Sequence, residues 1–134
     1  MPTSKELTIR LEDKPGTLGK CCKTLAARGV NILAFQAVPS EGNSAVRMVL
    51  DNPATAKEVL DAEHLTYTER EIAQANLTNR PGELARAASQ LGEANINIEH
   101  AYSGLDAKNS PVVFFAVKDV SKAVAILDKL AQAA

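Results

Sequence analysis

The chain has 134 residues, 46% of them hydrophobic, and a formal net charge of −1 at pH 7. With neither a basic run nor an excess of positive charge, it lacks the electrostatic footprint of a nucleic-acid-binding protein. No apolar stretch approaches membrane-spanning length, and the first six residues lack the apolar segment of a signal peptide. We therefore expect a cytoplasmic protein that contacts neither nucleic acid nor membrane.

Strands and helices are expected to alternate in the first half of the chain. Residues 5–12 place apolar and polar side chains alternately, which is the pattern of a half-buried strand. Apolar residues then recur at helical spacing from Leu18 until Gly29, a residue type that commonly ends helices. A second helix is expected after Asn52, a typical N-cap, with Pro53 in the first helical position. Further strands are expected over residues 30–38, 45–50 and 65–68, the first two joined by a loop over 39–43.

The second half repeats this order without its last strand. Its expected elements are a strand over 72–78, a helix over 82–94, a strand over 95–103, a loop over 104–111, a strand over 112–118 and a helix over 119–132. Because no strand is expected after this helix, the strand 72–78 is predicted to keep one unpaired edge, and such an edge invites another strand. That strand could come from the first half or from a second chain. We expect a homodimer, since pairing across a two-fold axis is the commonest solution.

The expected strand 112–118 is apolar on both of its faces. Val113, Phe115 and Val117 lie on one face, and Val112, Phe114 and Ala116 lie on the other. A sheet covered on only one side alternates more cleanly between apolar and polar residues. We therefore expect its helix-free face or its edge to be covered, by the other half of the chain or by a second chain.

Two stretches of the chain match each other at a constant offset of 66 residues. The first copy starts at Asp13 and the second at Asn79. A match at fixed offset is typical of a repeated unit, and we place the two units at 1–69 and 70–134. The order of elements predicts an α+β fold of two ferredoxin-like βαββαβ units, each with helices on one face of an antiparallel sheet. The unchanged residues are Pro15, Gly16, Leu18, Leu25, Asn31 and Ile32, which recur as Pro81, Gly82, Leu84, Leu91, Asn97 and Ile98.

This loop, helix and strand unit resembles the ACT domain, a small βαββαβ regulatory module that binds amino acids. The resemblance rests on Asp13, Lys14, Pro15, Gly16, Leu18, Val30, Asn31 and Ile32, and on Asn79, Arg80, Pro81, Gly82, Leu84, Ile96, Asn97 and Ile98. It covers nearly the whole chain as two tandem copies, and the absent last strand departs from it. The resemblance implies an amino-acid sensor whose ligand lies at an interface between ACT domains and which modulates a metabolic partner enzyme.

The loop that opens each copy has the chemistry of a carboxylate site. Pro15 fixes the turn, Gly16 lets a ligand approach, and the following helical turn presents unpaired N–H groups at the positive end of the helix dipole. Asp13 can meet an ammonium group, and Asn31 offers both a donor and acceptors. The candidate ligand-binding residues are Asp13, Gly16, Thr17, Leu18 and Asn31 in the first copy and Asn79, Gly82, Glu83, Leu84 and Asn97 in the second.

Each candidate also has a purely structural interpretation. The glycines can serve only the turn, the residues at 13 and 79 can form Asx turns, and the asparagines at 31 and 97 can hold a helix-to-strand corner. If one copy alone binds ligand, the second is favoured, because Asn79 adds no negative charge beside a carboxylate. Glu83 counts against this preference.

No constellation typical of an enzyme is visible in the sequence. His64 and His100 have no partners at metal-ligand spacing, and Cys21 and Cys22 lie in a helical pattern where they fit reduced, small apolar residues. We expect no catalytic activity, no metal and no cofactor. The alternatives to an amino-acid sensor are a ligand-free interaction module, such as an accessory subunit of an amino-acid biosynthetic enzyme, and a small ferredoxin-like enzyme.

Overall fold

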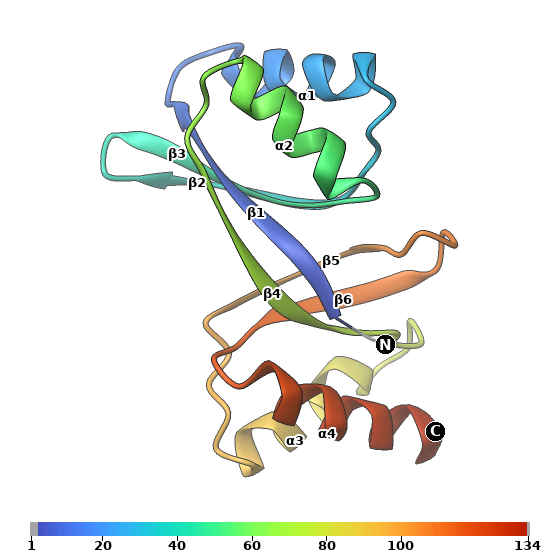
Figure 1. Ribbon diagram of the computed structural model, residues 1–134. Helices are drawn as coiled ribbons and strands as arrows, with labels where there is room; N and C mark the ends of the chain where they lie inside the picture. Colours follow the sequence, from blue (N-terminus) through green and yellow to red (C-terminus); the bar gives the residue numbers. More distant parts are fainter. Residues whose placement is uncertain (1–2, 134) are drawn as a thin grey trace. The chain divides into compact units, whose positions relative to one another are not determined.

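The computed structural model describes residues 3–133 (Figure 1). Its strands are β1 (Thr3–Glu12), β2 (Ile32–Ser40), β3 (Asn43–Leu50), β4 (Tyr67–Ala75), β5 (His100–Leu105) and β6 (Pro111–Ala116). Its helices are α1 (Thr17–Ala27), α2 (Pro53–Ala62), α3 (Glu83–Glu93) and α4 (Val120–Ala133). The predicted α+β class and the alternation of strands and helices are confirmed. Within the described residues, no helix is long and apolar enough to cross a membrane.

The chain forms two compact units that differ from a simple division at the repeat. The N-terminal unit is Lys5–Arg70, and the C-terminal unit comprises residues 71–133 together with Thr3 and Ser4. The prediction of separate strands over 65–68 and 72–78 was wrong, because β4 is one continuous strand. The polar residues between the two expected strands include neither glycine nor proline, so nothing in the backbone ends the first strand before the second begins.

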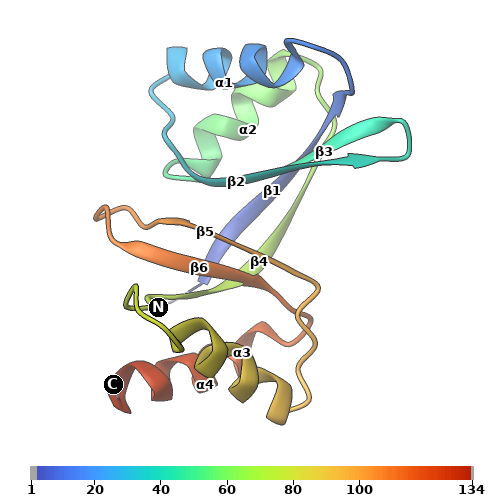
Figure 2. The same cartoon turned by 180° about the vertical axis from the view of Figure 1, so that it is seen from behind.

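The N-terminal unit has the ferredoxin-like strand order β2-β3-β1-β4. In the antiparallel pair of β1 and β3, Leu7 lies opposite Met48 and Ile9 opposite Val46, and all four side chains are buried. Figures 1 and 2 show α1 and α2 on one face of this sheet. The start of α2 is as predicted, because the Asn52 side chain accepts a hydrogen bond from the backbone N–H of the third helical residue at 3.1 Å.

The turn between β2 and β3 is tighter than predicted. Only Glu41 and Gly42 separate the strands, with φ of 48° and 85°, whereas a loop over 39–43 was expected. Two successive positive φ values are typical of the two-residue turn that matches the twist of a hairpin. Pro39 belongs to β2, where it is tolerated because β2 is the edge strand of this sheet.

In the C-terminal unit, the start of β1 takes the place of the missing last strand. Its own strands follow the order β4-β6-β5, and β1 is the neighbour of β4 on the other side. Thr3 and Ser4 belong to this unit, and the Ser4 hydroxyl donates to Gln74 Oε1 at 2.6 Å. The predicted absence of a strand after α4 is confirmed within residues 3–133. The prediction of a free edge was wrong, because the start of β1 lies beside β4.

The strand β6 is buried on both faces, as its composition indicated. Phe115 and Val117 pack into a core with α3 and α4, which both helices line from the same side (Figure 1). On the opposite face, Val112 and Phe114 are 2% and 1% exposed in the single chain, and the ring of Phe114 lies 5.8 Å from that of Tyr102. The apolar character of both faces therefore reflects burial of both.

Candidate functional site

The loop before α1 is shaped by its glycine. Gly16 is the N-cap residue with φ of 91°, a left-handed conformation that favours glycine, and Gly82 repeats it before α3 with φ of 89°. Neither cap is a side-chain oxygen. Thr17 closes the first turn instead, because its hydroxyl is placed to donate to the backbone carbonyl of Glu12, at 2.8 Å, or of Lys14, at 3.2 Å. The glycines thus have a structural role, and a Cβ at either position would meet no atom within 4 Å.

A pocket of about 550 Å³ opens beside this loop, within the N-terminal unit; we call it the first-copy pocket. Two of the predicted residues, Gly16 and Thr17, line it, whereas Asp13, Leu18 and Asn31 do not. The other residues that line the pocket come from β1, the loop after it, α1, and the end of α2 with the residues that follow it. The polar residues are Arg10, Glu12, Lys14, Lys20, Thr24 and Glu63, and the apolar ones include Leu11, Cys21, Val59, Leu60 and Leu65.

Some of the charged groups that line the first-copy pocket, of both signs, have no partner inside the unit. Lys14 pairs with Glu12 at 3.1 Å, and this pair is largely exposed to solvent. The side chains of Arg10, Lys20 and Glu63 make no hydrogen bond or ion pair with any residue in the described part of the chain. These three groups are therefore available to a ligand, and sequence reasoning did not single them out as site residues.

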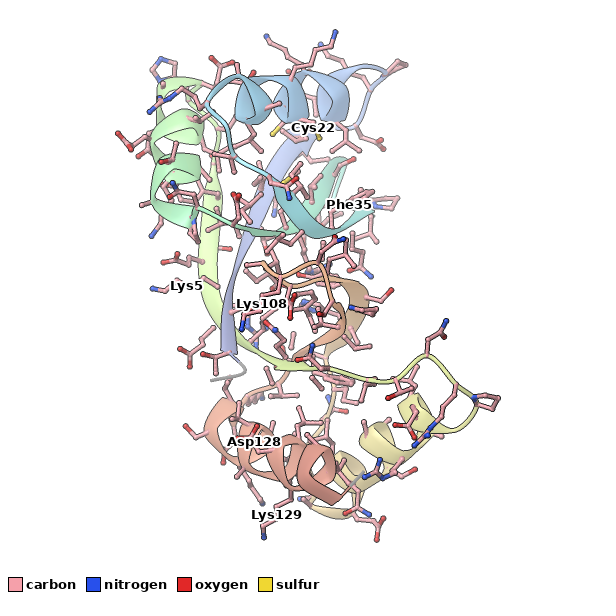
Figure 3. All side chains as sticks on the ribbon, turned by 90° about the vertical axis from the view of Figure 1, so that its right-hand side faces the viewer. Lys5, Cys22, Phe35, Lys108, Asp128 and Lys129 are labelled. Atoms are coloured by element: carbon pink, nitrogen blue, oxygen red, sulfur yellow. The ribbon has the colours of Figure 1, made fainter. Side chains whose placement is uncertain are left out.

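The thiols beside the pocket are not activated nucleophiles. Burial, aided by the charges of Cys22 and Glu63, raises the pKa of Cys21 to about 11, and burial also raises the pKa of Cys22. A thiol with a raised pKa stays protonated at neutral pH, and the thiolate is the reactive form. Both cysteines are free, in agreement with the sequence interpretation, and Cys22 lies on α1 as Figure 3 shows.

The second copy forms a smaller pocket, of about 210 Å³, at the corresponding place in the C-terminal unit; we call it the second-copy pocket. Of the predicted residues only Glu83 lines it. The Glu83 carboxylate lies 3.2 Å from Arg80 and 3.6 Å from Arg86. Arg86 also donates to the backbone carbonyl of Leu130 at 2.7 Å. Glu83 and Arg86 are thus paired with each other or with the backbone, whereas Asp128, which also lines the pocket, makes no hydrogen bond or ion pair with a described residue.

The two repeated asparagines lie away from these pockets. The backbone of Asn31 exchanges hydrogen bonds with Asp51, at 2.9 and 3.1 Å, while its side chain is exposed. Asn97 lies in a segment before β5, not in a strand as predicted, because the chain leaves α3 through Asn95 with φ of 62° and extended pairing begins only at His100. It lines a separate hollow of about 260 Å³ with neighbours that include Lys118 and Lys122.

The remaining candidates are mostly exposed. Asp13 and Asn79 are exposed, and within residues 3–133 their side chains make no hydrogen bond, so the alternative of an Asx turn is not realised. Leu84 is 55% exposed, whereas Leu18 packs against the core of the N-terminal unit. The residues that the structure describes hold no group of three potential metal ligands.

Known proteins that are similar to this chain share its fold. The family described as "ACT domain pair" matches residues 2–134. The crystal structure of protein BT0572 from Bacteroides thetaiotaomicron is 24% identical, with a TM-score of 0.84 over 95% of this chain and 88% of that one. The ligand-free regulatory subunit of aspartate kinase from Thermus thermophilus is 18% identical, with a TM-score of 0.65 over 96% and 91%. Its counterpart from Thermus flavus is 16% identical, with a TM-score of 0.65 over 96% and 92%. No curated protein matches the chain.

Proposed function

The chain belongs to the ACT domain pair family, and from this premise we propose that it is a non-catalytic regulatory protein of the cytoplasm. It binds a small amino acid and modulates a metabolic partner enzyme. ACT domains are regulatory modules, and the similar regulatory subunits of aspartate kinase share this fold. We keep 1–69 and 70–134 as the proposed domain boundaries.

The observation that carries this proposal is the first-copy pocket. It combines a volume of about 550 Å³, a glycine-capped helix start and unpaired charges of both signs. A free amino acid carries both charges, so its carboxylate and its ammonium group can each find a partner there. Ligand pockets generally combine an apolar lining with a few polar groups that fix orientation, as this one does.

Several predicted residues outside the pocket retain a role only if a second chain meets the surface on which each of them lies. In the resembled family, amino acids lie between ACT domains, and Asp13, Asn31, Asn79 and Asn97 are exposed side chains that a neighbouring chain could approach. We propose a homodimer that forms along β2. This strand is an edge strand of the sheet, and its Phe35, which Figure 3 labels, is exposed to solvent over 56% of its surface.

A thermal-shift screen of the twenty amino acids tests the proposed sensor. A ligand at a hundred times its Kd should stabilise the native protein by about 2.7 kcal/mol. We expect at least one L-amino acid to raise the melting temperature and its D-enantiomer to raise it less. If none of the twenty stabilises the protein, the sensor proposal fails.

The second candidate function is a ligand-free interaction module, such as an accessory subunit of an amino-acid biosynthetic enzyme. The second-copy pocket favours it, because Arg86 already engages Glu83 and the Leu130 carbonyl there. A screen without any stabilising amino acid, together with stable association with an enzyme of that kind, is the outcome expected for this function.

A further inference from the structure

The two pockets occupy equivalent positions in the repeat, which permits a direct comparison. The offset is 66 residues up to the end of β5 and 67 at α4, because the second copy contains one additional residue between these two elements. The caps of α2 and α4 confirm the second offset, since Asn52 accepts from the N–H of Thr55 and Asp119 accepts from that of Lys122. Arg10, Lys20 and Glu63 therefore correspond to Asn76, Arg86 and Leu130.

In the second-copy pocket, every counterpart is neutral or engaged. Asn76 has no charge, and its amide donates to Asp106 Oδ2 at 3.4 Å. The Arg86 guanidinium lies against Glu83 and donates to the Leu130 carbonyl at 2.7 Å. Leu130 replaces the acidic residue of the first copy, so no carboxylate stands at that position. The second-copy pocket has a volume of about 210 Å³ and the first-copy pocket one of about 550 Å³. This difference agrees with an Arg86 side chain that is held against neighbouring groups of its own unit.

In the first-copy pocket, the same three positions carry free charges around an apolar wall. Arg10 and Lys20 supply two cations, and Glu63 supplies one anion, none of them paired within the described residues. Leu11, Val59 and Leu65 contribute the apolar wall. Two cations suit a carboxylate, and an arginine can hold it by two parallel hydrogen bonds. The glutamate suits an ammonium group, and the wall suits a hydrocarbon side chain.

We infer that each chain binds one α-amino acid with an apolar side chain, in the first-copy pocket alone. Arg10 and Lys20 bind its carboxylate, and Glu63 binds its ammonium group. This inference rests on the proposed function and deepens it, because it names the ligand class, the residues and the stoichiometry. It also reverses the preference for the second copy that Asn79 suggested. Glu83 is held by arginines, and the described residues that line the second-copy pocket include an unpaired anion, Asp128, but no unpaired cation for a carboxylate.

The test exchanges pocket residues for those of the other copy. Calorimetric titration of the full chain with L-leucine, L-isoleucine, L-valine, L-methionine and L-phenylalanine should show one site per chain for at least one of them. Arg10→Asn and Glu63→Leu install residues that the fold already accepts at the equivalent positions. Each should weaken binding by about 10- to 100-fold, the usual effect of losing a hydrogen bond to a charged group.

Matched controls separate a binding role from a general effect of charge. Lys23→Ser removes a cation from the exposed side of α1, outside the pocket, and should leave affinity unchanged. Asn76→Ala alters the second-copy pocket and should also leave it unchanged. Glu63→Gln keeps the shape of the side chain and guards against misfolding of the leucine variant. The deaminated analogue 4-methylpentanoate should bind the wild type and Glu63→Gln equally, because it has no ammonium group.

The outcomes distinguish this inference from the proposed function. Binding of an amino acid at two sites per chain, or with unchanged affinity in folded Arg10→Asn and Glu63→Gln proteins, overturns the inference and leaves the sensor intact. Stabilisation by charged amino acids alone overturns the ligand class in the same way. If none of the twenty amino acids stabilises or binds the wild type, the proposed function and the inference both fall.

Discussion

Gly16 shows how one residue can look like a ligand contact and yet be required by the backbone. Its φ of 91° is a conformation that costs an L-residue about 1–2 kcal/mol, while the space around its missing Cβ is empty. We predict that Gly16→Ala destabilises the protein by about 1 kcal/mol, as measured by denaturant unfolding. Gly19→Ala is the matched control, because Gly19 lies inside α1 and alanine should stabilise a helix there by about 0.5–1 kcal/mol. Equal stability of the two variants would contradict the prediction.

Asp106 is a second residue whose role follows from its local hydrogen bonds. Its Oδ1 accepts from the backbone N–H groups of Ser110 and Lys108, each at 2.9 Å. The hydrogen bond from Ser110 is the main cause that lowers the pKa of Asp106 below its ordinary value of 3.8. The ionised form therefore stabilises the loop between β5 and β6 above the ordinary pKa, and this effect is lost as pH falls through the lowered pKa.

An NMR titration of the Asp106 carboxyl group tests this assignment. We expect a midpoint below 3.8 in the native protein and an upward shift of that midpoint when the loop is unfolded by denaturant. A native midpoint at or above the ordinary value would show that the loop hydrogen bonds do not favour the carboxylate.

Among the elements, the edge strands β2 and β5 differ in the size of the exposed apolar side chain at equivalent positions. Phe35 on β2 is 56% exposed, whereas its counterpart in the second copy, Ala101 on β5, is a small residue. We predict that Phe35→Lys weakens the proposed homodimer, because a charge on an edge strand opposes pairing with another strand. Leu105→Lys is the matched control on β5, where 40% of the leucine is exposed.

Light scattering across a range of micromolar concentrations measures this effect. The wild type and Leu105→Lys should keep the mass of a dimer, while Phe35→Lys should shift towards the monomer. A dimer that Phe35→Lys leaves intact, or a monomeric wild type, would remove β2 from the assembly.

At the scale of the whole molecule, the two units are alike in sequence, but they differ in whether each contains all the strands that it needs to fold alone. The N-terminal unit contains all four strands of its sheet, whereas the C-terminal unit relies on Thr3 and Ser4 beside β4. A fragment of 71–134 would lose that neighbour and expose the edge of β4, at a size where folding alone is marginal. We predict that it is largely unfolded or self-associated.

Circular dichroism and light scattering of two fragments check this prediction. The fragment 3–75 should unfold cooperatively, because its sheet order β2-β3-β1-β4 is complete. A monomeric fragment of 71–134 that unfolds with equal cooperativity would show that the start of β1 is dispensable for the C-terminal unit.

Local patterns in the sequence were sufficient to predict the four helices, most of the strands and the family. The alternation over 5–12, the helical spacing after Leu18 and the cap at Asn52 each depend on neighbouring residues, so they can be read without the fold. The repeat added the division into similar units, and the Pro-Gly loops with the following Asn-Ile pairs indicated ACT domains, which the family match shows.

Only the tertiary structure decided how those elements complete each other. No local pattern indicates that Ser4 lies beside Gln74, that β4 runs through the expected boundary, or that Arg86 reaches the carbonyl of Leu130. The same holds for the first-copy pocket, where Arg10 and Glu63 line one cavity from elements far apart in the chain. These features depend on contacts between residues that are distant in sequence, and such contacts exist only once the sheet and its helices have packed.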